Sequence, residues 1–229
     1  MTTQMNVGIY IFEDMTMLDG YAPLQMLSFV EQFNTFTFAK TEQPVQADCG
    51  VPLTPQYGLE TCPPLDILIM PGGGDVLGQM RDAELITWLQ RTAPSTRYIT
   101  SVCTGALILA EAGLLDGYKA ITHWGWVEQL AAYRNIEVAD QRVVVDRDRI
   151  TGGGITAGLD FALTLIAEVI GPPAAQSIQL LFEYRPQPPF DSGSPKNAAP
   201  EVLGPVSGMI DSRKVELNAH IAATQGADF

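Results

Sequence analysis

Cys103 is the residue whose position in this chain best suits a nucleophile. It follows the apolar, β-branched residues 98–102 and directly precedes a small-residue helix pattern over residues 104–112. A strand that turns sharply into a helix exposes the junction side chain at the carboxyl edge of a sheet, beside the unpaired N–H groups of the helix start. Because those groups and the helix dipole favour negative charge, we expect this thiol to ionise more easily than free cysteine. The alternative is an inert, buried thiol.

Asp19 is the second candidate for chemistry. It lies in a predicted loop, residues 13–20, between a strand over residues 5–12 and a helix over residues 21–33. The carboxylate could simply cap that helix. If the loop lies over the same sheet edge as Cys103, desolvation and a neighbouring thiolate would raise the pKa of Asp19. The carboxyl group could then hold a proton, donate it and later act as a base.

Thr104 and two glycine runs are candidates for positioning a reacting group. The Thr104 hydroxyl could cap its own helix, bond a reacting group, or do both. The N–H groups of Gly72 and Gly73 could bind developing negative charge, or the run could be a simple tight turn. This run lacks the Lys and the Ser or Thr of a phosphate loop. Gly152 would allow close packing or close backbone approach near Cys103.

His123 follows a predicted strand over residues 120–122 and precedes Trp124. It is either a structural, hydrogen-bonded histidine or a third catalytic group. The other histidine, His220, is expected on the surface of the final helix. The two are far apart in the sequence and neither is paired with cysteines, so the pattern predicts no metal site.

The order of predicted elements sets where these residues meet. Strands alternate with helices, which predicts an α/β fold whose mostly parallel sheet is covered by helices on both faces. In such sheets, ligands bind outside the carboxyl ends of the strands. The pattern predicts further strands over residues 35–40, 65–70, 143–145 and 149–151, further helices over residues 83–93, 156–170, 174–184 and weakly 201–223, a hairpin with linker over 43–64, and a loop over 185–200.

Composition limits the partners of the chain. A length of 229 residues fits one domain spanning 1–229. With 46% hydrophobic and 17% charged residues, the chain should be globular. Lys and Arg total 13 against 26 Asp and Glu, a net charge of −13, which argues against nucleic acid as a partner. A small or neutral substrate is therefore expected.

The three cysteines, Cys49, Cys62 and Cys103, show no CxxC spacing. There is also no secretory signal pattern and no long apolar run, so we expect a reducing cytoplasm and no membrane segment. A second thiol close to Cys103 for disulfide chemistry is given low weight.

These residues together resemble the ThiJ/PfpI superfamily. The resemblance implies a class I glutamine amidotransferase-like, flavodoxin-type fold, with a core over about residues 5–185 and a C-terminal extension over about 186–229. It also implies a nucleophile elbow, no cofactor and a homodimer. The segments that carry the resemblance are the acidic loop after the first strand, Pro71 to Gly74, Ser101 to Gly105, Ala112 to Gly117, Thr122 to Trp124, and Thr151 to Gly158.

Within the superfamily, the chain most resembles the members that hydrate isocyanides. Asp19, the run Ser101 to Thr104 and the tail segments 181–190 and 192–195 carry this likeness. It implies conversion of R–NC to an N-substituted formamide through a covalent Cys103 thioimidate. Asp19 would donate a proton and then activate water. Thr104, His123 and backbone near Gly72, Gly73 and Gly152 are the expected positioning groups.

Two other functions stay open. One is a different cysteine enzyme of the superfamily, with glyoxalase-like or deglycase activity. Those members usually carry glutamate at the position of Asp19, and the protease-like members carry histidine at the position of Thr104. The other is a non-enzymatic ligand or oxidation sensor that uses Cys103.

Overall fold

A six-stranded sheet forms the centre of the computed structural model, which describes residues 4–227 and 229. Five strands run parallel and only β9 is antiparallel, paired with β10. Taken in chain order, the parallel strands have the flavodoxin-like arrangement 2-1-3-4-5, which confirms the expected fold class. The strands lie in the order β2 (Phe33–Phe38), β1 (Met5–Tyr10), β5 (Ile67–Met70), β6 (Tyr98–Val102), β10 (Arg149–Gly152) and β9 (Val143–Asp146).

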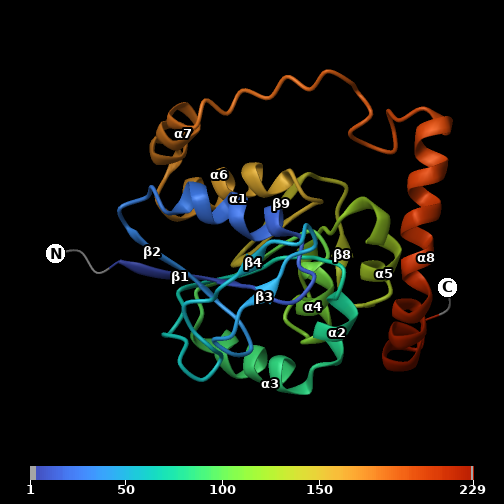
Figure 1. Cartoon of the computed structure of the whole chain (residues 1–229), viewed down its shortest axis with the longest axis horizontal. Coiled ribbons are helices and arrows are strands. Elements are labelled where there is room, and N and C mark those ends of the chain that lie inside the picture. The colour runs from blue at the N-terminus through green and yellow to red at the C-terminus, as the bar shows by residue number, and fades with distance from the viewer. Residues whose placement is uncertain (1–3, 228) are drawn as a thin grey trace.

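Helices cover both faces of the sheet (Figure 1). This explains why β5 is buried at all four positions: a parallel strand covered on both sides is apolar throughout. One layer contains α1 (Met17–Leu27), α6 (Ala157–Val169) and α7 (Pro172–Leu181). The opposite layer contains α2 (Val76–Arg81), α3 (Ala83–Thr92), the 3-10 turn η1 (Ala93–Ser95) and α4 (Gly105–Glu111).

Smaller elements surround this core. The predicted excursion over 43–64 contains the antiparallel pair β3 (Val45–Gln46) and β4 (Pro52–Leu53). A separate parallel pair is formed by β7 (Lys119–Ala120) and β8 (Glu137–Val138). The 3-10 turn η2 (Trp124–Trp126) leads into α5 (Val127–Ala131). The chain then ends on α8 (Pro200–Gln225), reached through a long segment without helix or strand.

Several boundaries differ from those predicted. The first helix starts at Met17, so Asp19 lies in its first turn and not in a loop. The apolar period from Tyr21 onward marks only the later turns of this helix. The predicted strand over residues 120–122 corresponds to β7, which is shorter and lies outside the main sheet. The short helices α2 and α5 were not predicted. The final helix is continuous over 26 residues rather than weak. Residues 1–3 and 228 of the expected single domain lie outside the described residues.

Within the described part of the chain, no helix has both the length and the apolar character that crossing a membrane requires.

Candidate active site

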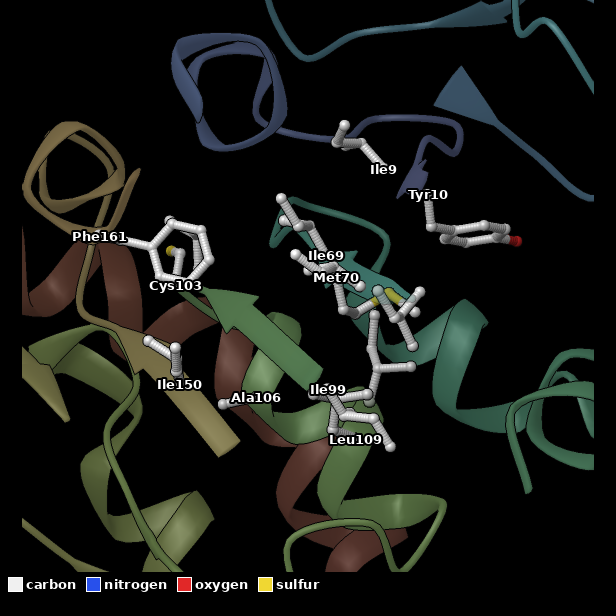
Figure 2. Packing of buried hydrophobic residues seen from close by; sticks show 14 of the residues in the cluster. Ile9, Tyr10, Ile69, Met70, Ile99, Cys103, Ala106, Leu109, Ile150 and Phe161 are labelled. Atoms are coloured by element: carbon white, nitrogen blue, oxygen red, sulfur yellow. The ribbon is translucent and has the colours of Figure 1, made fainter. Parts of the chain in front are cut away.

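Cys103 occupies a sharp turn between β6 and α4, where the β6 arrow ends in Figure 2. Its φ of 57° is left-handed, which a residue with a Cβ rarely adopts. The turn is held by backbone: the Cys103 N–H donates to the carbonyls of Gly152 (3.0 Å) and Gly153 (3.1 Å). The Thr122 hydroxyl donates to the Cys103 carbonyl at 2.9 Å. The expected elbow is therefore confirmed, and its strain is maintained by the surrounding strands.

The environment of the thiol corrects two expectations. Cys103 is only 6% exposed, so it is not a surface thiol. Burial, and then the charge of Asp19, raise the pKa of this thiol well above its usual range. The N–H groups of Thr104 and Ile155 hydrogen-bond to the sulfur and act in the opposite direction. Desolvation by the packed core outweighs them, which the local strand-to-helix pattern does not reveal.

Asp19 is completely buried beside Cys103. Burial raises its pKa from 3.8 to about 7, against hydrogen bonds from the Cys103 thiol and the Gly72 N–H that lower it. Oδ2 accepts from the Gly72 N–H at 3.1 Å, whereas Oδ1 is buried without a regular hydrogen bond from the described residues. Thr16 is the N-cap residue of α1, so Asp19 is not the cap. The predicted direction of the Asp19 shift is confirmed, with desolvation as its main cause.

Thr104 and the glycine run hold one another in place. The Gly73 N–H donates to the Thr104 hydroxyl oxygen at 3.1 Å, and this side chain makes no capping bond to its own helix. Thr104 is therefore the N-cap residue of α4 by position, but its hydroxyl does not cap the helix. The N–H groups of Gly72 and Gly73 are already engaged by Asp19 and Thr104, so they orient these side chains instead of facing a reacting atom. Gly152 acts through its carbonyl, which fixes Cys103.

Gly72 has no room for a side chain. A Cβ there would lie 2.4 Å from the Thr104 hydroxyl oxygen, 2.6 Å from the Thr104 nitrogen and 3.0 Å from Asp19 Oδ2. We predict that Gly72→Ala folds but moves the Thr104 and Asp19 side chains apart. Turnover in a reaction at Cys103 should then fall about 100-fold, because small displacements of catalytic groups have effects of that size. Steady-state kinetics with circular dichroism would measure this. Gly193→Ala is the matched control because its Cβ would meet open space; equal activity of both variants would refute the positioning role.

His123 is placed as a hydrogen-bond donor. Its Nδ1 accepts the Gly125 N–H at 3.1 Å, which leaves the ring hydrogen on Nε2. Burial lowers the pKa of His123 to about 4, so the ring is neutral at physiological pH. The rings of Trp124 and Trp126 flank it, with centroids 5.4 Å and 5.2 Å away. A neutral imidazole cannot stabilise a thiolate as a cation would.

A cavity of about 430 Å³ connects these groups. Cys103, Thr104, Gly73 and His123 line it, and Asp19 adjoins it beside the Cys103 thiol, to which it hydrogen-bonds. The sequence prediction missed the remaining lining residues. The missed residues that belong to α8 recur at helical spacing, and this spacing in the sequence could have identified one face of that helix. The missed residues are Asp14, Thr16, Asp48, Gly74, Val76, Leu77, Trp124, Trp126, Ile155, Val206, Met209, Ile210, Arg213 and Leu217.

Among residues 4–227 and 229, no group of three or more His, Cys, Asp and Glu side chains is arranged to hold a metal ion.

The flavodoxin-type sheet, with a cysteine at a left-handed elbow and a buried acid beside it, defines a class of α/β proteins. The chain belongs to the DJ-1/PfpI family, which residues 5–168 match. It is similar to the isonitrile hydratase of Pseudomonas putida, with 42% identity over 199 residues covering 87% of both chains.

Other relatives share less of the chain or of its sequence. A THiJ/PfpI family protein from Pseudomonas syringae has 37% identity and a TM-score of 0.92, covering 96% of this chain and 91% of that one. The regulator GbdR of Pseudomonas aeruginosa is 31% identical over 188 residues, which cover 78% of this chain and 50% of the regulator. Drosophila melanogaster DJ-1beta, at 18% identity and a TM-score of 0.73, shares the fold; the match covers 79% of this chain and 98% of DJ-1beta.

Proposed function

We propose that this protein is an isocyanide hydratase that converts R–NC and water into an N-substituted formamide. The observation that carries the proposal is the buried pair of Cys103 and Asp19 beside a cavity of mixed polar and apolar lining. The terminal carbon of an isocyanide is electrophilic toward soft nucleophiles, which suits sulfur. The 42% identity to an isonitrile hydratase supports the same chemistry.

The first step forms a carbon–sulfur bond. The pair carries one proton, shared between the Cys103 thiol and the Asp19 carboxylate. With that proton on Asp19, the thiolate attacks the isocyanide carbon, and Asp19 delivers the proton to the same carbon. The product is a thioimidate, R–N=CH–S–Cys103, and Asp19 is left as a carboxylate. The N–H groups of Thr104 and Ile155, which bond the sulfur, stabilise the thiolate before attack.

The second step adds water. The Asp19 carboxylate takes one proton from water while the hydroxide oxygen bonds the carbon, and Asp19 then passes that proton to the substrate nitrogen. As the carbonyl forms, the remaining hydroxyl proton returns to Asp19, the carbon–sulfur bond breaks and the thiolate leaves. The formamide R–NH–CHO is released and the pair regains its single proton. Thr104, through its hydroxyl, and His123, through Nε2–H, position the water and the intermediate.

Formation of N-benzylformamide from benzyl isocyanide tests the proposal. Purified, reduced protein should produce the formamide, followed by liquid chromatography, and Cys103→Ala in parallel should not. A folded wild type that forms no formamide would remove the hydratase function. Lactate from methylglyoxal, or selective peroxide oxidation of Cys103 without turnover, would then favour the other enzyme or the sensor.

The pH profile of kcat/KM should rise with pH through an apparent pKa near 7. Below that value Asp19 is protonated while the thiol is neutral, so the pair holds two protons and no thiolate can form. Above it, the pair carries the single proton that both steps need. Because the thiol pKa is raised, activity should stay flat to about pH 9. A profile that falls between pH 6 and 8 would contradict this assignment.

We also propose a homodimer. Exposed apolar side chains gather beyond α1 and at the end of α7, where Phe29 (52% exposed) meets Phe182 edge-on and Leu180 is 82% exposed. Light scattering at micromolar protein should give twice 24.8 kDa, about 50 kDa. Leu180→Glu should shift the mass toward the monomer. A monomeric wild type would disprove the assembly.

A further inference from the structure

One face of α8 forms a wall of the cavity that contains Cys103. Five of its residues line the cavity, and their spacing of three or four positions places them on a single stripe of the helix. Four are apolar and only Arg213 is charged. The stripe consists of Val206, Met209, Ile210, Arg213 and Leu217.

The C-terminal half of α8 is fixed to the body of the protein. Leu217 (1% exposed) and Ile221 (0%) are buried in the core. The Gln129 amide donates to Asn218 Oδ1 at 2.9 Å, and His220 lies 3.2 Å from the Glu111 carboxylate at the end of α4. His220 is therefore a docking residue of α8 and not a surface residue as expected. These contacts place the stripe at a defined position over the cavity, with η2 packed against α8. In Figure 1, α8 flanks one side of the fold.

The cavity is lined by both polar and apolar groups. Cys103 and Thr104 contribute the reacting sulfur and a hydroxyl group beside polar backbone. The α8 stripe, with Trp124 and Trp126, supplies apolar surface. An isocyanide is linear, so a substrate whose terminal carbon meets the Cys103 sulfur must point its N-substituent away from the elbow. An apolar substituent gains most from burial against the apolar part of the lining, which α8 and the two tryptophans supply.

Part of this chain lies outside the fold that it shares with some relatives. The DJ-1beta match covers 98% of DJ-1beta and only 79% of this chain, which leaves about a fifth of this chain without a counterpart. The Pseudomonas syringae structure matches 96% of this chain. A shared fold with additional segments is the arrangement expected when one fold serves different functions.

We propose that α8 determines substrate selectivity, by forming a binding wall for bulky, neutral, apolar N-substituents such as aryl or branched alkyl groups. This inference rests on the proposed hydratase function and adds the substrate class. A small substituent buries less apolar surface against the stripe and gains less from it. Asp14 and Asp48 also line the cavity and disfavour anionic substituents.

The test compares benzyl isocyanide with ethyl isocyanide in two variants of α8. Val206→Ala removes apolar surface from the stripe, whereas Val215→Ala makes the same change on the opposite, solvent-exposed side, where Val215 is 71% exposed. The ratio of kcat/KM for benzyl over ethyl isocyanide should fall about 10-fold in Val206→Ala. It should equal the wild-type ratio in Val215→Ala.

A second pair of measurements guards against misfolding. Val206→Trp fills the cavity and should lower the same ratio about 100-fold, while circular dichroism reports the fold. Met209→Ala should act in the same direction as Val206→Ala. An unchanged ratio in folded Val206→Ala and Val206→Trp overturns the selectivity proposal and leaves the hydratase function intact. A wild type that turns over neither substrate overturns both.

Discussion

Replacing Cys103 with alanine abolishes isocyanide hydration, with an expected loss on the order of 10⁴-fold or more, as for other enzymes that lose their nucleophile. In the proposed mechanism every covalent step passes through this sulfur, and no other cysteine lines the cavity among the described residues. Cys103→Ser should be nearly as inactive because a hydroxyl is a poorer nucleophile toward the soft isocyanide carbon. The fold should persist, since either side chain fits the space of the buried thiol.

Two measurements check this prediction. Steady-state rates of formamide formation give the loss, with Cys49→Ser as control because that thiol is exposed and outside the cavity. Acid-quenched wild type, analysed by mass spectrometry during turnover, should carry an adduct equal in mass to the whole isocyanide. Adding the S–H group across the isocyanide carbon neither gains nor loses atoms. An active Cys103→Ala enzyme would end the covalent mechanism.

Asp19→Asn should lower kcat/KM about 100-fold or more, because the amide can neither deliver a proton to carbon nor activate water. It should also remove the rise of activity near pH 7, since the group that titrates there is gone. The amide oxygen can still accept the Gly72 N–H bond, so the local geometry should be kept. Asp116→Asn, an exposed carboxylate outside the cavity, serves as the control.

Asp19→Asn should also raise the free energy of unfolding above that of the wild type at high pH. The pKa of Asp19 is about 7 in the folded chain and 3.8 as its ordinary value, so the folded state holds a proton that the unfolded state has lost between these values. The free energy of unfolding therefore decreases as pH rises from 4 through 7, by up to about 4 kcal/mol. Asparagine avoids this loss. Urea unfolding should show the advantage of Asp19→Asn growing from near zero at pH 4 to that size at pH 8; an advantage independent of pH would refute the buried-charge argument.

The sequence predicted the scaffold of the site better than its environment. Apolar runs ending at Met70, Val102 and Gly152 marked three neighbouring strands, because a strand buried on both faces has a strong pattern. The resemblance to a known family supplied the strand order. The pairing of Cys103 with Asp19 also came from that topology, since 84 residues separate them in the chain.

What the sequence could not provide was burial. The elbow pattern predicted an acidic, exposed thiol, yet packing around Cys103 desolvates it and reverses the direction of its pKa shift. The predicted start of α1 was wrong. Asp19 was a candidate for the N-cap, but Thr16 is the N-cap residue, and the Asp19 carboxylate accepts from Gly72, 53 residues away in the chain. The cavity wall from α8 depends on how a distant helix docks, which no local pattern specifies.

The left-handed backbone at Cys103 has a consequence for how this position can evolve. Asp14, Cys103 and Ile155 are three of the five described non-glycine residues with positive φ, and all three line the cavity. Glycine would adopt the φ of 57° without penalty, so selection for folding alone favours glycine at position 103. Under the proposed function, selection for the reaction is what retains the sulfur. In a lineage that no longer needs the reaction, the elbow would drift to glycine while the cavity survived as a binding site.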